Sequence, residues 1–147
     1  MKRPLLAIGV VAVLLLGACS DDDDQVAKVE KDELIRKADA VCTSANDDIR
    51  TMTSSGAASN VDEISTLDFL KTELFPRLDK EVGDLKDLGE PKSNRKDWDE
   101  IVKDYDAALS NMKQSADHDA VQALADFGKT FAAARQKAQA FGMKECA

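Results

Sequence analysis

Apolar residues recur every three or four positions along most of the chain after residue 30, and charged or polar residues lie between them. This spacing is typical of amphipathic helices that bury one face. It predicts helices over residues 31–52, 61–88 and 94–116, and a fourth helix whose apolar stripe runs from Val121 to Phe141. Four amphipathic helices joined by fairly short links predict an all-α domain, specifically an antiparallel four-helix bundle.

Proline, glycine and capping residues refine these boundaries. Pro76 removes one backbone hydrogen bond and clashes with the preceding turn, so we expect the second helix to be kinked or broken near Pro76. Gly142 suits the left-handed residue just past the end of the fourth helix. Three helix starts are predicted by capping residues, namely Asn60 with Glu63, Ser93, and Asp119 with Gln122.

The first 18 residues follow another pattern. A basic start is followed by an apolar run over residues 5–16 and by two small residues before Cys19. This order is that of a secretory signal peptide, and the ending Leu16-Gly17-Ala18-Cys19 resembles a bacterial lipobox. The resemblance implies a diacylglyceryl group on the Cys19 sulfur and cleavage before it; an ordinary signal peptide is the alternative. The run of about 12 residues is shorter than the roughly 20 that a spanning helix needs.

The leader divides the chain into three parts. We expect residues 1–18 to be removed, residues 19–30 to form a lipidated acidic tether, and residues 31–147 to form the helical domain. Four like charges at residues 21–24 repel one another and extend the tether. A calcium loop is the alternative reading of this run, but the run lacks the EF-hand spacing and its glycine. The mature protein would then sit on the outer face of the cell membrane, held by lipid alone.

Charge limits the kinds of partner. The chain has a formal net charge of −8, and removal of the leader would leave 18 basic against 28 acidic residues. Binding to nucleic acid needs clustered Lys and Arg, so we expect no nucleic acid partner. An acidic chain is equally unsuited to lying flat on anionic lipid headgroups.

Two cysteines remain once Cys19 carries lipid. Cys42 and Cys146 would be exposed to an oxidising compartment after export, where two cysteines usually pair. Such a disulfide closes a loop of about 100 residues, for which the chain-entropy model gives roughly 4–5 kcal/mol. A redox or metal pair is the alternative, but there is no Cys-x-x-Cys, and His118 is the only histidine.

Few side chains are candidates for catalysis. His118 lies in a predicted turn, and the chain has no Glu-x-x-His pair for a diiron site. Five carboxylates on the third helix could do acid–base work, but they alternate with predicted core residues and are expected to face water. We therefore expect no catalytic residue, no metal and no cofactor. The five carboxylates are Asp97, Asp99, Glu100, Asp104 and Asp106.

Three aromatic residues form the candidate ligand pocket. Trp98 and Tyr105 lie seven residues apart on one face of the third helix, and Phe131 lies on the fourth. They could line a pocket for a small apolar molecule, although core packing is the role that the same spacing favours. A carrier of such a molecule would need an internal cavity beside Trp98 or Phe131.

Several segments together resemble a family. Residues 37–42 (Lys-Ala-Asp-Ala-Val-Cys) and 140–146 (Ala-Phe-Gly-Met-Lys-Glu-Cys) are similar to the bracketing motifs of small uncharacterised actinobacterial lipoproteins. Phe75-Pro76, residues 88–91 (Leu-Gly-Glu-Pro) and Trp98 resemble their middle section. The resemblance implies an exported helical domain in which Cys42 and Cys146 pair, and it brings no activity. Such proteins often have two prolines after the second helix, where this chain has only Pro91.

These features together predict a lipid-anchored envelope protein that binds or scaffolds a protein partner and is not an enzyme. One alternative is a carrier that holds a small apolar ligand in the bundle core. The other is a hydrolase that uses the carboxylates of the third helix. The sequence does not name the partner or the oligomeric state.

Overall fold

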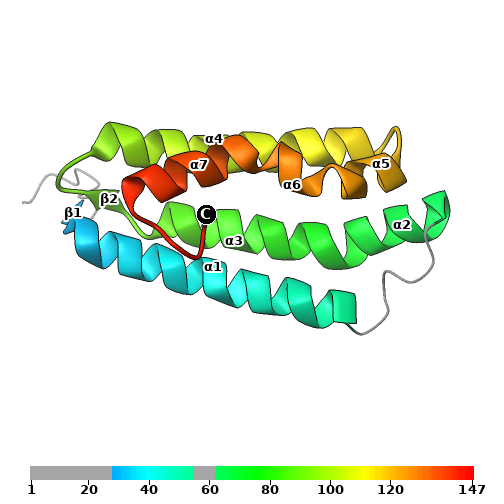
Figure 1. Ribbon diagram of the computed structural model, residues 1–147, viewed down its shortest axis with the longest axis horizontal. Coiled ribbons are helices and arrows are strands. Elements are labelled where there is room, and N and C mark those ends of the chain that lie inside the picture. The colour runs from blue at the N-terminus through cyan, green and yellow to red at the C-terminus, as the bar shows by residue number, and fades with distance from the viewer. Residues whose placement is uncertain (1–27, 55–61) are drawn as a thin grey trace, which may run out of the picture.

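The computed structural model describes residues 28–54 and 62–147, and most of them lie in helices (Figure 1). The predicted all-α class is therefore confirmed. The signal peptide and Cys19 lie outside the described residues, and so does the tether as far as residue 27. Within the described residues, β1 (Lys28–Val29) and β2 (Glu90–Pro91) form a two-residue parallel pairing.

The first helix forms where its apolar stripe predicts it. α1 (Lys31–Ser54) buries Leu34, Ala38, Cys42 and Ala45, which follow one another at intervals of three or four and therefore share a face. This face packs against α3, introduced below. Acidic residues in the first turn of α1 complement the positive end of the helix dipole.

Residues 63–87 follow one helical path with a wider turn in its middle. α2 (Glu63–Phe69) runs into η1 (Leu70–Leu74), a π-helical turn, and α3 (Phe75–Asp87) continues from it. The N–H of Phe75 bonds to the carbonyl of Leu70, five residues earlier instead of four. Pro76 has no N–H to donate and its ring crowds the preceding turn, which the wider turn relieves. At the place where the sequence predicts a kink or break, the structure thus has a π turn.

The start of α2 differs from the prediction. Asp62 caps the helix, because its carboxylate accepts the N–H of Ser65 at 3.0 Å. Asn60, the predicted cap, lies outside the described residues. Glu63 is the first residue of α2. Its carboxylate accepts the N–H of Ala120 at 2.6 Å and so caps a helix 57 residues further along the chain.

The third predicted helix is α4 (Arg95–Ala116). The prediction that Ser93 caps it is wrong, since Asn94 occupies the cap position with a left-handed backbone at φ 60°. Asn94 tolerates this conformation better than most residues. Its side-chain amide donates to Asp97 at 3.2 Å.

The fourth predicted helix is divided. α5 (Ala120–Ala125), α6 (Phe127–Thr130) and α7 (Ala132–Phe141) replace a single uninterrupted helix, and that prediction is wrong. Asp126 and Phe131 join the three pieces with ψ near zero, which breaks the regular helical ladder. The carboxylate of Asp126 accepts from the side chains of Gln122 and Lys129, and its backbone N–H still bonds to the carbonyl of Gln122. Asp119 does cap α5, as predicted, by accepting the N–H of Gln122 at 2.8 Å.

The helices pack along the long axis of the molecule (Figure 1). α4 packs against α3, α5, α6 and α7, and α1 packs against α3. The core lies where these helices meet. Its largest fully buried side chains are Leu34, Leu70, Leu85, Ile101, Met112 and Met143.

Candidate functional site

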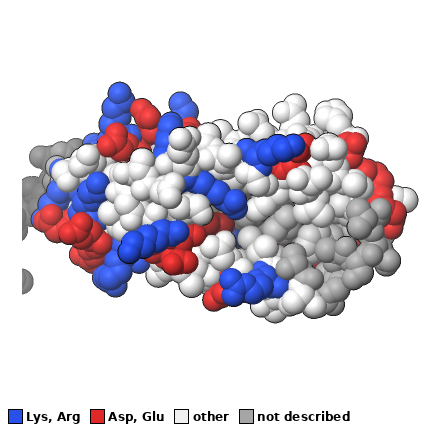
Figure 2. Space-filling view, in the orientation of Figure 1, with Lys and Arg blue, Asp and Glu red and all other residues white. Residues whose placement is uncertain are grey.

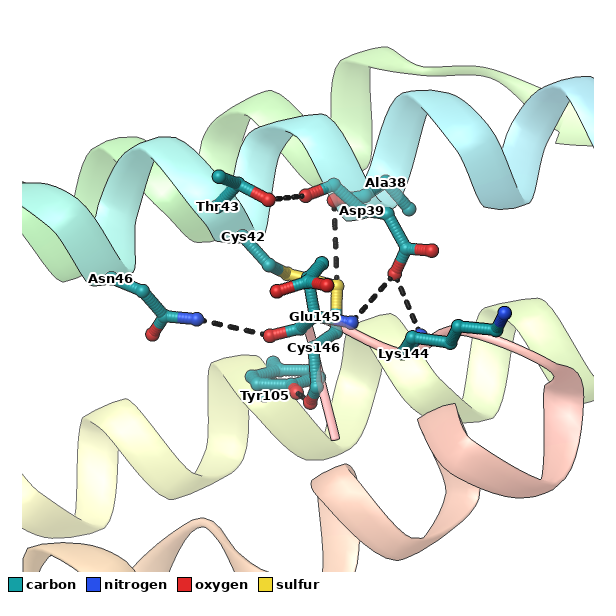
Figure 3. Close-up of a disulfide and its surroundings, with 9 residues drawn as sticks. All are labelled: Ala38, Asp39, Cys42, Thr43, Asn46, Tyr105, Lys144, Glu145 and Cys146. Carbon is teal, nitrogen blue, oxygen red and sulfur yellow. Dashed lines mark hydrogen bonds between the residues drawn. A yellow bond between two sulfur atoms is a disulfide. The ribbon is translucent and has the colours of Figure 1, made fainter.

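The chain after α7 turns back onto α1. Gly142 ends α7 with φ 114°, a left-handed conformation that glycine adopts without a side-chain clash and that the sequence predicts. Met143 is 1% exposed and anchors the turn in the core. Residues 142–147, called the tail below, then cross the face of α1 (Figure 3).

The tail is fixed by the disulfide between Cys42 and Cys146, as predicted. The two Cα atoms lie 5.2 Å apart, and the bond joins residues 104 positions apart in the sequence. Both cysteines are buried, at 1% and 4% exposure. The bond therefore ties the end of the domain to the middle of its first helix.

Hydrogen bonds hold the tail on both sides of the disulfide (Figure 3). One carboxylate oxygen of Asp39 accepts the N–H groups of Lys144 and Glu145 at 2.8 and 2.9 Å. The side-chain amide of Asn46 donates to the carbonyl of Glu145 at 3.0 Å. The hydroxyl of Tyr105 donates to the carbonyl of Cys146. The tail is thus bonded both to α1 and to α4.

A small, partly open cavity lies beneath the tail. It has a volume of about 40 Å³, and Glu81, Tyr105, Phe131 and Arg135 are among its lining residues. We call it the Glu81 cavity. A space of this size holds a few water molecules at most, whereas pockets for organic ligands span roughly 300–1,000 Å³.

The titratable groups around this cavity are shifted by burial. Burial raises the pKa of Glu81 to about 7, and the guanidinium of Arg135 opposes the shift. Burial also raises the pKa of Tyr105 to about 12, with a further contribution from the Glu81 charge. Tyr105 therefore keeps its proton at neutral pH and remains a hydrogen-bond donor to the tail.

Glu81 also lines a groove on the outside of the molecule. The groove lies between α1 and α3 and has a volume of about 280 Å³. We call it the α1–α3 groove. Its walls include the apolar side chains Val41, Ala45 and Pro76. Glu81 thus borders both the Glu81 cavity and the α1–α3 groove.

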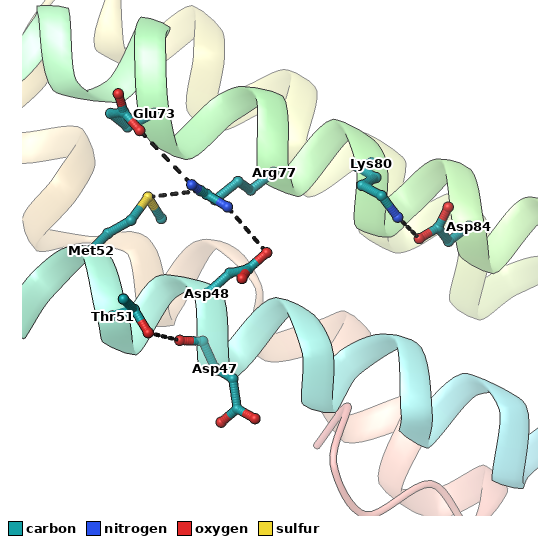
Figure 4. A network of polar contacts seen from close by, with 8 residues as sticks. All are labelled: Asp47, Asp48, Thr51, Met52, Glu73, Arg77, Lys80 and Asp84. Carbon is teal, nitrogen blue, oxygen red and sulfur yellow. Dashed lines mark hydrogen bonds and ion pairs between the residues drawn. The ribbon is translucent and has the colours of Figure 1, made fainter.

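Ion pairs bridge this groove (Figure 4). Arg77 of α3 reaches Asp48 of α1 at 3.1 Å and Glu73 at 4.0 Å, and its Nε donates to the sulfur of Met52. Lys80 pairs with Asp84 one helical turn further along α3. The charges on the groove rim are therefore largely satisfied within the chain.

The predicted ligand-pocket residues do not share one cavity. Tyr105 and Phe131 both border the Glu81 cavity, and their ring centroids lie 6.2 Å apart. Trp98 is 3% exposed and packs against Phe141 with centroids 6.0 Å apart. It borders a separate open hollow beside Lys86 and Val102. All three aromatic side chains are buried and contribute to packing.

The carboxylates of α4 lie on its outer surface in ion pairs or hydrogen bonds with side chains of α3, α4 and α7. Asp104 and Glu100 pair with Lys137 at 2.8 and 3.3 Å, and Asp106 pairs with Lys86 at 2.8 Å. His118 is exposed near the end of α4. In Figure 2, acidic and basic side chains likewise lie next to one another on the visible face.

Two features are absent from residues 28–54 and 62–147. These ranges contain no helix with both the length and the apolar character needed to cross a membrane. In the same part of the chain, no three Asp, Glu, His or Cys side chains converge in a group that could hold a metal ion.

Comparison with known proteins gives no identification. No protein-family model, no curated protein and no solved structure matches this chain. The resemblance to actinobacterial lipoproteins therefore stays a prediction.

The sequence pattern could have indicated Glu81. It lies three residues after Leu78 and four before Leu85, both of which are buried. A charged residue at this spacing sits on the apolar face of a helix and is a candidate for partial burial. Asp39 carries no such signal, because its role depends on how the tail returns to α1. Arg135 carries none because its approach to Glu81 depends on where α7 lies relative to α3.

Proposed function

We propose that this protein is an exported, lipid-anchored helical module that binds a protein partner at the outer face of the cell membrane and catalyses no reaction. We further propose that its helices form an antiparallel four-helix bundle, in which α2, η1 and α3 make up one arm and α5, α6 and α7 another. Cys19 would carry the lipid, and residues 19–30 would hold the domain off the bilayer.

The observation that carries this proposal is the Cys42–Cys146 disulfide. Structural disulfides form and persist in oxidising compartments and are rare in the cytosol. The leader pattern and the lipobox-like residues 16–19 supply the route to such a compartment. A tail held by hydrogen bonds on both sides of the disulfide suits a permanent structural bond rather than a catalytic one.

A binding role also agrees with the surface. The α1–α3 groove is open to solvent and combines apolar walls with charged rims, as protein contact surfaces do. The carrier alternative gains little support, because the Glu81 cavity beside Phe131, at about 40 Å³, is too small for an apolar ligand, and the hollow beside Trp98 is open. The hydrolase alternative gains little support either, since the α4 carboxylates are engaged in exposed ion pairs.

Fractionation of expressing cells tests the anchor. We expect the parent protein in the membrane fraction and the Cys19→Ala variant outside it, because two acyl chains hold a protein stably on a bilayer. Mass measurement with and without reductant checks in the same samples that Cys42 and Cys146 are paired. Recovery of Cys19→Ala in the membrane fraction, or of unprocessed protein with free thiols inside the cell, would contradict the proposal.

Crosslinking on intact cells tests the binding role. A photoreactive residue replaces exposed Ser44 in the α1–α3 groove, and exposed Gln136 on α7 serves as the matched control position. We expect one discrete crosslinked protein from position 44 and none from position 136. Identical patterns from both positions would mean that the groove is not the contact surface.

A further inference from the structure

The α1–α3 groove contains one carboxylate whose charge is not matched by a nearby partner. Asp48 and Glu73 share Arg77, and Asp84 pairs with Lys80. Within the described residues, no hydrogen bond and no ion pair within 4.0 Å reaches Glu81. Its remaining partner is the longer-range attraction of Arg135 across the Glu81 cavity.

An unmatched carboxylate at the edge of a packed core is costly. Partial burial removes water from the charged form, and the chain offers no donor in exchange. A cation that enters the groove would supply this donor, and hydrogen bonds between charged groups are stronger than neutral ones. The groove therefore favours a ligand that carries positive charge.

The side chains that line the groove favour one kind of cation. Val41, Ala45 and Pro76 offer apolar surface beside the carboxylate. A lysine or arginine side chain matches this combination. Its methylene stem packs on apolar surface, and its charged head donates to an acceptor such as a carboxylate. A metal ion would need several converging ligands, and the described residues contain no such group of three.

We propose that the α1–α3 groove binds a basic side chain, Lys or Arg, presented by a partner protein, with the Glu81 carboxylate as its acceptor. This inference names the recognition chemistry of the binding role proposed above and rests on it. The net charge of −8 on the chain adds a long-range attraction for a basic partner.

The protonation of Glu81 gives this site a signature in its pH dependence. Its pKa of about 7 means that the carboxylate is mostly ionised at pH 8 and mostly neutral at pH 6. A basic side chain prefers the ionised form, so binding should be roughly tenfold weaker at pH 6 than at pH 8. The other charged or titratable groups around Glu81, from every element that borders it, are Asp48, Glu73, Arg77, Lys80, Asp84, Tyr105, Arg135 and Glu145.

The test uses two short peptides that differ in one charge. Acetyl-Ala-Ala-Lys-Ala-Ala-amide and its norleucine counterpart are titrated into the purified exported protein, and amide NMR shifts are followed at Ser44 and Thr72 of the groove. We expect the lysine peptide to shift these resonances at pH 8 and the norleucine peptide to leave them nearly unchanged. Glu81→Gln should weaken lysine-peptide binding by about fivefold, the upper end of what an exposed charge pair contributes.

A matched variant separates this role from a general loss of charge. Glu73→Gln removes an exposed carboxylate from the same groove and should leave the affinity within about twofold of the parent. The inference is overturned if the lysine peptide does not shift groove resonances, if the shifts map to another face, or if both variants bind as the parent does. Because the peptide assay needs no membrane, its failure is distinguishable from failure of the anchoring and crosslinking experiments.

Discussion

At the residue scale, Glu81 lowers the stability of the fold, because burial penalises its charged form. A neutral side chain at this position would fill the same place between Leu78 and Leu85 without the cost of burying charge. Burial raises the pKa of Glu81 from its ordinary 4.5 to about 7, so the folded protein holds this proton more tightly than the unfolded chain does.

The direction in which Glu81 changes the free energy of unfolding with pH follows from its proton binding in the folded and unfolded states. Between pH 4.5 and 7 the folded state binds more protons at Glu81, so the contribution of this group to stability is full below pH 4.5 and is lost as the pH rises through 7. We expect Glu81→Gln to gain stability relative to the parent over this range, by at most about 3 kcal/mol. Urea denaturation of both proteins at pH 4.5, 6 and 8 measures the difference, and a difference independent of pH would contradict the burial of this carboxylate.

Gly142 has its role fixed by the backbone. Its φ of 114° is one that side chains with a Cβ rarely adopt, and a Cβ there would lie 3.1 Å from Cδ1 of Ile35. We expect Gly142→Ala to lower the free energy of unfolding by about 1–2 kcal/mol. Gly83→Ala is the control, because it lies within α3 with open space around its Cβ and should raise stability by about 0.5–1 kcal/mol. Equal effects of the two substitutions in thermal unfolding would show that Gly142 is not held in this conformation.

At the scale of elements, the sequence predicts what depends on local pattern. The stripe of α1 and the disturbance at Pro76 follow from spacing and proline chemistry alone. The division of the last helix at Asp126 and Phe131 does not, since both residues fit an uninterrupted apolar period. Both residues have ψ near zero, a backbone detail that apolar spacing does not report.

A hydrogen bond between α2 and α5 should make the stability of α5 depend on a residue of α2. Glu63 begins α2, yet its carboxylate caps α5 by accepting the N–H of Ala120 at 2.6 Å. We expect Glu63→Ala to destabilise the protein by about 1 kcal/mol, as loss of a helix cap usually does. Hydrogen exchange should also quicken at the amide of Ala120. Glu73→Ala is the matched control on the same helical path, and unchanged exchange at Ala120 in Glu63→Ala would contradict the cap.

At the scale of the whole molecule, the disulfide stabilises the fold by restricting the unfolded chain. It closes a loop of about 100 residues, so its removal should cost about 4–5 kcal/mol, much of it through the greater freedom of the unfolded chain. We expect the Cys42→Ala, Cys146→Ala double variant to show this loss in urea denaturation and faster hydrogen exchange at Lys144 and Glu145. A loss below about 1 kcal/mol would mean that Asp39, Asn46 and Tyr105 hold the tail without the bond.

The candidate site was only partly predictable from the sequence, because much of it depends on how the helices pack. Cys42 and Cys146 could be paired from the compartment that the leader implies, without any geometry. Trp98, Tyr105 and Phe131 could be identified as buried aromatics, but their distribution between two separate hollows depends on how α4 meets α7. The α1–α3 groove required the packing of two helices, because its small side chains look like ordinary core residues in the sequence.

The pairing of β1 with β2 determines where mechanical load would enter the domain. Val29 accepts the N–H of Lys92 at 2.9 Å, and Lys92 forms an ion pair with Glu30 at 2.6 Å. A pull on the chain ahead of Lys28 therefore acts on this pairing, and through it on the link between α3 and α4, as well as on α1. If Cys19 anchors the chain to a bilayer, part of any such load passes to β2 and the α3–α4 link instead of falling on α1 alone.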